Sequence, residues 1–373
     1  MKKDKNAKID PSVGCRLNRV GGQAVLEGVM MKAGDRTVTT CRKGDGTLVV
    51  TDDNFVSIRK KYKVLNIPIL RGVINFVEMM MLSVKTLGAS ADALGLEEDE
   101  PSKFEKWLKE KLGLDITNFV MIVSIILGLA LSVFLFLCLP IWISAGINLV
   151  LDYFFNTEMG PTLTSVVEGV VKMAIFIGYL SLVSFMPDIR RTFMYHGAEH
   201  KSIACFEAGE ELTPENAMKH TRFHRRCGTS FMFLMILLGI FAGIIIKQVI
   251  PGLGTLTYTV IRLLILPLVM GIGYEIIMVA GKHDNIVTRI ISAPGLWVQR
   301  ITTKEPTLDM LEVAIVSIKC ALRDDFPEFE EYHRLRAWEP IPEPEAEPEA
   351  EVAECEADEA AETVECESEE NDA

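Results

Sequence analysis

Long apolar segments without charge alternate with polar segments through the middle of the chain. No charged residue stands between Asp115 and Asp152, and none stands between Arg226 and Lys247. A helix of about 20 apolar residues is long enough to cross ~30 Å of hydrocarbon. We therefore predict a mainly α membrane protein with about four transmembrane helices, the first of which is kinked or ended by Pro140. These spans cover residues 116–139, 164–186, 227–246 and 257–280.

Charged residues interrupt two of these spans. Glu168 and Lys172 lie one helical turn apart near the start of the second span, where an ion pair between them can reach the interface. The fourth span contains Arg262, whose long side chain can snorkel, and Glu275. We expect Glu275 to bond a neighbouring helix, to pair with Lys282, or to face the cytosolic site described below.

Shorter patterns before the spans predict cytosolic elements. Residues 37–42 and 47–51 alternate apolar and polar positions around a glycine-containing turn at residues 43–46, which is typical of a β hairpin. From Pro68 to Leu87, apolar residues recur at helical spacing while polar residues occupy the other face. An amphipathic helix at the membrane interface fits this pattern better than a fifth span does.

Two amphipathic helices are predicted after the last span. Residues 285–303 have one apolar face, are interrupted at Pro294-Gly295, and place Trp297 where an interface anchor would lie. The apolar positions from Leu308 to Leu322 describe a further helix, which we expect to pack on the cytosolic domain.

Acidic residues accumulate at the end of the chain. The formal net charge of the 373 residues is −13, but 16 Asp and Glu and no Lys or Arg follow from Glu339 onward. This tail has no apolar periodicity, so we predict that it is disordered. The chain thus divides into four parts. Residues 1–115 form a cytosolic region with a small β hairpin element and an amphipathic interfacial helix, and residues 116–281 form a transmembrane region with a histidine-rich cytosolic loop at residues 187–228. Residues 282–338 form cytosolic amphipathic helices, and residues 339–373 form the acidic tail.

The distribution of basic residues predicts the orientation in the membrane. Of the 38 Lys and Arg, 20 precede the first span, none lie between the first two spans, seven lie between the second and third, and eight follow the fourth. Short loops rich in Lys and Arg remain cytoplasmic. We therefore expect a multi-pass protein of the plasma (inner) membrane with both termini and the histidine-rich loop in the cytoplasm.

The histidine-rich loop carries the residues best suited to catalysis. In the sequence from His196 to His200, two histidines at positions i and i+4 share one helical face, and Glu199 stands between them. This H-x-x-E-H order is that of inverted zinc proteases, in which both imidazoles bind zinc and the carboxylate activates water. We predict a divalent metal site, with zinc preferred, two histidine ligands, and Glu199 as the catalytic general base.

Several other residues could complete this site. Glu207 continues the same helical face. A second helix starting at Thr213 is expected to place His220 and His224 together, with Cys227 just beyond, and the remaining candidates approach from other segments. Eight scattered cysteines without a C-x-x-C pair exclude a disulfide framework. The candidate ligands are His196, His200, Glu207, His224, Cys227 and His283, and further carboxylates that could reach the site are Glu27 and Glu275.

The same residues also have structural interpretations. Histidines spaced by four are often polar surface, and Gly197 weakens the helix between them by ~1 kcal/mol. For the segment from Gly21 to Met31, the favoured interpretation is a glycine turn that leads into a short buried segment. In the alternative interpretation, Glu27 supplies a carboxylate to the metal site. Basic residues beside the third span are explained by orientation, or alternatively by the binding of anionic lipid head groups.

Separated motifs together resemble one protein family. These motifs are residues 21–31, residues 195–201, the stretch from Arg222 to Thr229, and the pairs at 274–275 and 282–283. They resemble the YqhQ family, bacterial integral membrane proteins with a domain of unknown function that are often labelled predicted metal-dependent enzymes. The likeness extends from Asn18 to Leu322 and implies the membrane architecture described above.

The sequence is consistent with three functions. The first is a metal-dependent hydrolase that acts on a lipid or peptide bond near the bilayer. The second is a non-catalytic membrane scaffold or membrane-biogenesis factor with a structural His/Cys cluster, and the third is a transporter. The expected partners are membrane lipids and further copies of the chain, and no nucleic acid.

Overall fold

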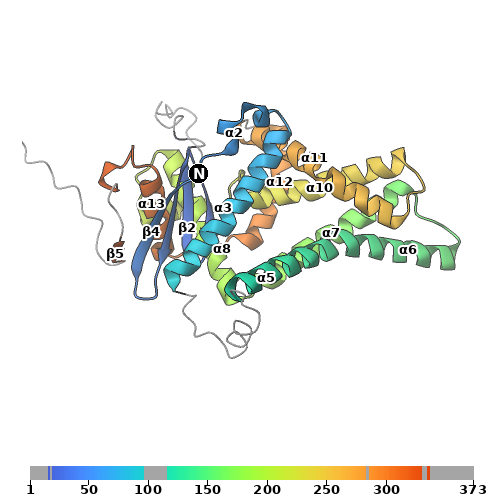
Figure 1. The fold of residues 1–373 in the computed structure, drawn as a ribbon, viewed down its shortest axis with the longest axis horizontal. Coiled ribbons are helices and arrows are strands. Elements are labelled where there is room, and N and C mark those ends of the chain that lie inside the picture. Colours follow the sequence, from blue (N-terminus) through green and yellow to red (C-terminus); the bar gives the residue numbers. More distant parts are fainter. Residues whose placement is uncertain (1–15, 17–18, 96–115, 283–284, 330–333, 337–373) are drawn as a thin grey trace, which may run out of the picture.

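The computed structural model describes residues 16, 19–95, 116–282, 285–329 and 334–336. The predicted acidic tail and the candidate ligand His283 lie outside these residues. Within them, a small β-sheet with three packed helices forms one end of the molecule, and a bundle of long apolar helices extends from it (Figure 1).

The sheet has five antiparallel strands in the order β1-β2-β3-β4-β5. The hairpin predicted around residues 43–46 is confirmed as β3 and β4, in which Arg42 pairs with Leu48. The segment interpreted as a glycine turn is instead the hairpin of β1 and β2, whose two-residue loop contains Glu27 at φ 46°. The strands are Val20–Val25, Gly28–Ala33, Arg36–Arg42, Thr47–Asn54 and Arg334–Arg336.

Helices cover both faces of the sheet. Alternate residues of a strand point to opposite faces, so Val29 and Met31 pack on helices α8 (Pro187–Ala208) and α13 (Leu308–Ala321). Met30, between them, packs on Leu82 of α3 (Leu70–Leu94). The helix after Leu308 packs on the sheet and α8, as its apolar positions predicted.

Among the residues that the structure describes, five helices are long and apolar enough to cross a membrane by length and composition. Four of them correspond to the predicted spans, and the fifth is α3, whose sequence we interpreted as interfacial. They comprise α3, residues Ile126–Phe155, α7 (Pro161–Val183), α10 (Gly228–Val249) and α11 (Thr255–Lys282, apolar to Ala280).

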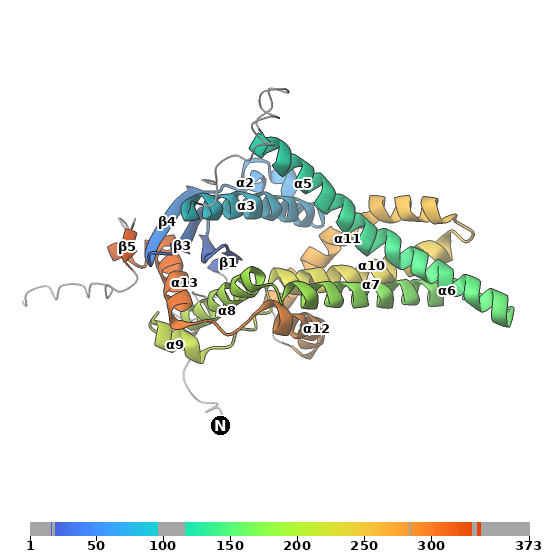
Figure 2. The same ribbon diagram turned by 90° about the horizontal axis from the view of Figure 1, so that it is seen from below.

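Pro140 neither ends nor breaks the first span. Helix α5 (Ile116–Val133) continues through a π-helical turn at Phe134–Cys138 into α6 (Leu139–Phe155), and together they form one rod (Figure 2). A proline lacks the N–H of an α-helical bond, and its ring clashes with the carbonyl one turn earlier. A π-turn placed before the proline accommodates both problems, which explains why the helix extends beyond the predicted end.

The helix after the last span is also continuous. Helix α12 (Ile286–Thr302) is amphipathic as predicted and begins at a capping box formed by Asn285 and Thr288. The predicted interruption at Pro294-Gly295 is wrong, because Gly295 packs directly on Ser230 of α10. The remaining short helices are α2 (Ile58–Lys61), η1 (Lys63–Asn66), α9 (Pro214–Lys219) and η3 (Pro327–Phe329).

Candidate metal centre

Helix α8 carries the H-x-x-E-H motif between the sheet and the segment that follows α12. Gly197 permits this position, because a Cβ built there would lie 2.0 Å from the carbonyl oxygen of Lys304. The backbone N–H of Lys304 in turn donates to the carbonyl of Phe193 at 2.8 Å. The glycine that was expected only to weaken the helix is therefore where another chain segment crosses α8.

Three of the predicted ligands come together. The rings of His196 and His200 are 4.4 Å apart, and His196 Nε2 lies 3.2 Å from the Sγ of Cys227, the residue that caps the start of α10. One ligand atom from each of the three residues lies within 4.8 Å of the other two. The site thus joins α8 to the start of α10, a candidate membrane span.

Backbone carbonyls fix both histidine tautomers. Nδ1 of His196 is 2.9 Å from the carbonyl of Thr302, and Nδ1 of His200 is 2.6 Å from the carbonyl of Arg222. Because a carbonyl only accepts hydrogen bonds, each Nδ1 carries a proton, and in the neutral form of the ring the lone pair is then on Nε2. Metal-binding histidines are commonly oriented in this way.

The electrostatic environment favours neutral imidazole. His200 is buried, and desolvation lowers its pKa from the ordinary value of 6.5. Neutral imidazole is the form that binds a metal. Ordinary Zn–N and Zn–S bond lengths place N and S about 3.5 Å apart in a tetrahedral site, and the observed 3.2 Å between His196 and Cys227 is close to that separation. These three residues fit zinc, and their two nitrogens and one sulfur leave a fourth position.

Glu199 lies beside these ligands in a buried setting. Burial raises the pKa of its carboxyl group to about 7, although His196 acts in the opposite direction. Its Oε2 has no hydrogen-bond partner among the residues that the structure describes, and its side chain packs against Gly22 of β1. A carboxyl group in this setting can exchange a proton near neutral pH.

His224 and Glu207 lie next to the three ligands but have other partners. The His224 ring is 5.5 Å from that of His200, and Arg226 donates to its Nε2 at 3.2 Å. Glu207 forms an ion pair with Arg226 and is 3.8 Å from His224. Contrary to the prediction, His224 does not lie on a helix with His220, because α9 ends at Lys219.

The two other candidate carboxylates, Glu27 and Glu275, each form an ion pair with an arginine. Glu27, in the β1–β2 loop, pairs with Arg191 and lies 3.4 Å from the hydroxyl of Tyr195, so it connects the sheet to α8. Glu275 pairs with Arg71 and connects α11 to α3.

Gln299 is a site-forming residue that the sequence did not reveal. It is fully buried on α12, accepts from the backbone N–H of His224 at 2.8 Å, and donates to the carbonyl of the same residue at 2.7 Å. It also donates to Ser230 at 3.0 Å. Gln299 therefore holds the loop beside the candidate ligands, and only its place on the buried face of an amphipathic helix could have indicated this.

A second group of potential ligands comprises Cys205, Glu210 and His220. Burial raises the pKa of the Cys205 thiol to about 11, and Glu210 is already paired with His220 at 3.1 Å. A thiol that holds its proton is a poor metal ligand. The first group is the better candidate.

Comparison with known proteins identifies relatives without an assigned activity. Residues 67–324 match the family described as protein of unknown function (DUF1385). The chain is 33% identical over 308 residues to the uncharacterized protein YqhQ of Bacillus subtilis (strain 168), which corresponds to 81% of this chain and 92% of that protein. No solved structure matches the chain.

Proposed function

The chain belongs to the DUF1385 family, as its YqhQ-like motifs predicted. That family has no assigned function, and we propose a function from the geometry of the candidate metal centre. The protein is a membrane-bound hydrolase with a zinc centre at its cytosolic face. His196, His200 and Cys227 hold the metal, and the substrate is an ester or amide bond of a lipid or peptide at the bilayer surface.

The observation that carries this proposal is the orientation of the two histidines. Both donate Nδ1–H to backbone carbonyls, so both Nε2 lone pairs are available on the side where Cys227 lies. Two polar surface histidines would not require two separate backbone carbonyls from distant segments. A nitrogen and sulfur ligand set also favours zinc over calcium or magnesium.

The open fourth position supports catalysis over a structural role. Catalytic zinc keeps such a position and, when bound, lowers the pKa of a coordinated water to about 7. Arg226 donates to His224 Nε2, so this nitrogen is engaged and does not close the site. Glu199, buried and adjacent, serves as the proton acceptor for the attacking water.

A structural scaffold is the second candidate function. It is favoured by the closeness of His224, whose ring lies 5.5 Å from that of His200 and could supply a fourth ligand after a small movement. Four protein ligands would give a closed site that joins α8, the following loop and α10.

Metal analysis of the purified full-length protein tests whether the site binds zinc. We expect about one zinc per chain, and loss of that zinc in the double variant His196→Ala, His200→Ala, because a single remaining thiolate cannot hold it. His220→Ala, in the second group, is the matched control and should retain the metal. Wild-type protein without stoichiometric metal, or loss of zinc from the His220 variant alone, would contradict this assignment.

The proposal requires that the bundle of apolar helices crosses the plasma membrane and that the metal site lies on its cytoplasmic side. Cysteines introduced by Asn156→Cys and Gly254→Cys should react with a membrane-impermeant maleimide in intact cells, because both positions lie in loops poor in Lys and Arg. Glu210→Cys should react only after permeabilisation. Labelling at position 210 in intact cells would place the site outside and refute the topology.

A further inference from the structure

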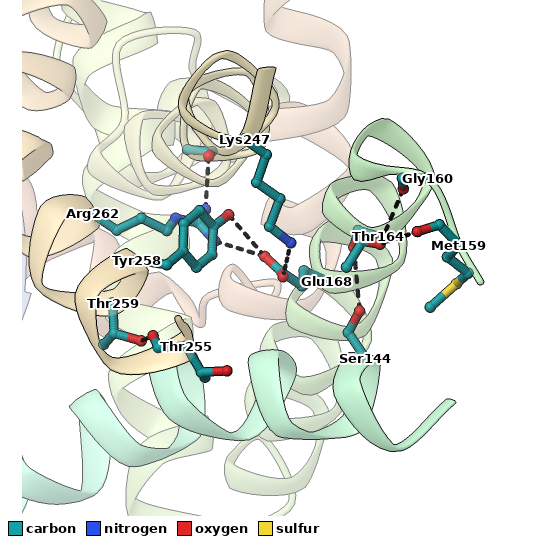
Figure 3. Close-up of polar contacts among 11 residues, drawn as sticks. Ser144, Met159, Gly160, Thr164, Glu168, Lys247, Thr255, Tyr258, Thr259 and Arg262 are labelled. Atoms are coloured by element: carbon teal, nitrogen blue, oxygen red, sulfur yellow. Dashed lines mark hydrogen bonds and ion pairs between the residues drawn. The ribbon is translucent and has the colours of Figure 1, made fainter. Parts of the chain in front are cut away.

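Polar contacts tie the apolar helices together at the end of the bundle remote from the sheet. Glu168 of α7 is 3% exposed and accepts hydrogen bonds from Lys247 at 2.6 Å and Arg262 at 3.0 Å. The Tyr258 hydroxyl donates to the same carboxylate at 3.1 Å (Figure 3). The predicted ion pair between Glu168 and Lys172 is therefore wrong, because these partners come from α10 and α11. Since α7, α10 and α11 are fixed relative to one another, their contacts give the depth of other segments along the bundle.

The turn before α3 contacts the bundle near its other end. Ile69 has φ 71°, and the N–H of Leu70 donates to the carbonyl of Pro68 at 2.9 Å, which is the strained form of the γ-turn. This turn packs on Gly271 of α11, where an added Cβ would lie 2.5 Å from the Ile69 carbonyl oxygen. One helical turn later, Glu275 accepts from the N–H of Ile69 at 3.3 Å. A strained turn persists where its surroundings hold it, so its depth is fixed.

These contacts place Ile69 inside the apolar part of the bundle. Gly271 lies nine residues before Ala280, where the apolar part of α11 ends, which is about 14 Å along the helix. A Cβ added at the nearby Gly273 would lie 3.0 Å from the sulfur of Met235. Met235 is seven residues, or about 10 Å, after the start of α10. Both helices therefore place the turn well below the end of the bundle that faces the sheet.

Helix α3 rises from this depth to the sheet. The rings of Phe76 and Phe231 are 5.9 Å apart, and Phe231 is only three residues after the start of α10. Ten residues further along α3, Thr86 accepts a hydrogen bond from Gln23 of β1 at 2.6 Å. Leu82, between these two contacts, packs in the core of the sheet. The second half of α3 thus lies on the sheet, and only its first turns lie among the apolar helices.

Helix α2 is held where α3 leaves the bundle. The buried Glu78 carboxylate of α3 accepts from the Ser57 hydroxyl at 2.8 Å and from the N–H of Ile58 at 2.6 Å. Arg59 donates to Asn75 of α3 at 3.0 Å. Asn75 and Glu78 flank the contact of α3 with the start of α10, so α2 lies at the edge of the apolar region (Figure 1). The chain between α2 and Ile69 therefore descends from this edge into the apolar region.

The descending segment exposes apolar side chains. Val64 is 75% exposed and Ile67 is 52% exposed, although both lie beside the apolar helices. Exposed apolar side chains that are grouped together mark a surface that contacts a partner or a membrane. The large exposed apolar residues of this segment are Ile58, Tyr62, Val64, Ile67 and Ile69.

The charge of the segment fits an acidic membrane surface. No Asp or Glu stands between Asp53 and Glu78, whereas five Lys and Arg do. Three of these five pair with carboxylates of other segments. Lys61 and Lys63 are exposed and form no ion pair within the ranges that the structure describes. Lysines next to exposed apolar residues are typical of segments that lie in the interface of an anionic bilayer.

We propose that residues 58–69 form an anchor segment that inserts into the leaflet on the side of the sheet and binds acidic phospholipid. Its apolar side chains enter the hydrocarbon, and Lys61 and Lys63 bind lipid phosphates. Helix α3 carries the anchor segment into this leaflet without spanning the bilayer. The proposal depends on insertion of the apolar helices in a membrane and is independent of the metal centre.

Val64→Trp tests the depth of the anchor segment in the full-length protein in nanodiscs. Bromine atoms on the acyl chains of phosphatidylcholine quench tryptophan on contact, so the tryptophan added at position 64 should lose fluorescence in discs of this lipid. The difference from wild type isolates its signal. Gly44→Trp, in the exposed turn between β3 and β4, is the control and should add an unquenched signal. Quenching of the native Trp142, which is 57% exposed on α6, verifies that the bundle is inserted.

Brominated phosphatidylglycerol as a minor component tests the choice of lipid. At equal amounts in phosphatidylcholine discs, it should quench the tryptophan at position 64 more strongly than brominated phosphatidylcholine does. Adding Lys61→Gln and Lys63→Gln should lower this local enrichment by roughly fivefold for each lysine, the value for ~1 kcal/mol per basic residue near an anionic surface. Lys43→Gln with Lys219→Gln removes two exposed lysines outside the anchor segment and should leave the enrichment unchanged.

Three results would overturn the proposal. If position 64 is quenched no more than position 44 while Trp142 is quenched, the segment lies outside the bilayer, and another protein or a second copy of the chain covers its apolar side chains. If the variant without Lys61 and Lys63 keeps the full preference for phosphatidylglycerol, the segment does not bind acidic lipid. If Trp142 is not quenched either, the bundle is not inserted, and the membrane location fails together with the anchor segment.

Discussion

The Glu199→Gln variant of the zinc-loaded protein should lose hydrolytic activity while keeping its metal. The amide has the shape of the carboxylate but cannot accept a proton from water, and general base catalysis contributes about 10²–10⁴-fold to rate. Glu199 is not one of the three residues that come together as ligands, so metal content should stay near that of wild type. Hydrolysis of an activated aryl ester such as p-nitrophenyl acetate, measured beside zinc analysis, provides the readout.

A matched control separates this effect from a general loss of negative charge. Glu210→Gln removes a carboxylate that pairs with His220 just after α8, and it should leave both hydrolysis and zinc unchanged. If Glu199→Gln retains full activity and full metal, the carboxylate is not the base. If zinc is bound but no variant and no wild type hydrolyses the ester above background, the structural scaffold becomes the better assignment.

The long apolar helices and the central hairpin could be predicted because their signals are local. Apolar length and strand alternation are properties of consecutive residues, and tertiary contacts only refine them. The predicted helix breaks at Pro140 and Pro294 were wrong because each was inferred from the local preference of proline alone. Proline disfavours a helix locally, but a preceding π-turn at the first position and close packing of the neighbouring Gly295 on Ser230 at the second keep the helix continuous.

The candidate site was predicted in part. His196 and His200 are related by helical spacing, so the sequence alone places them together. Cys227 is 31 residues from His196, and only its position in the same loop suggested that they meet.

The carboxylates were harder to assign from sequence. Glu27, Glu207 and Glu275 each pair with an arginine. Two of these arginines lie more than 160 residues away along the chain, a relation that no local pattern encodes.

Gly197→Ala should destabilise the protein and loosen the metal site together. An added Cβ would lie 2.0 Å from the carbonyl oxygen of Lys304 and 3.2 Å from its carbon, and this backbone cannot move freely because Lys304 N–H bonds to Phe193. Overpacking of this kind typically costs about 1–3 kcal/mol. The segment that would shift begins two residues after Thr302, whose carbonyl orients His196, so zinc affinity should fall as well.

Gly88→Ala in α3 is the control, because nothing lies within 4 Å of its Cβ position and alanine favours a helix by up to ~1 kcal/mol. Thermal unfolding and zinc content of both variants give the result. Equal stability of the Gly197 and Gly88 variants would show that the crossing of α8 by residues 303–306 is not a tight contact.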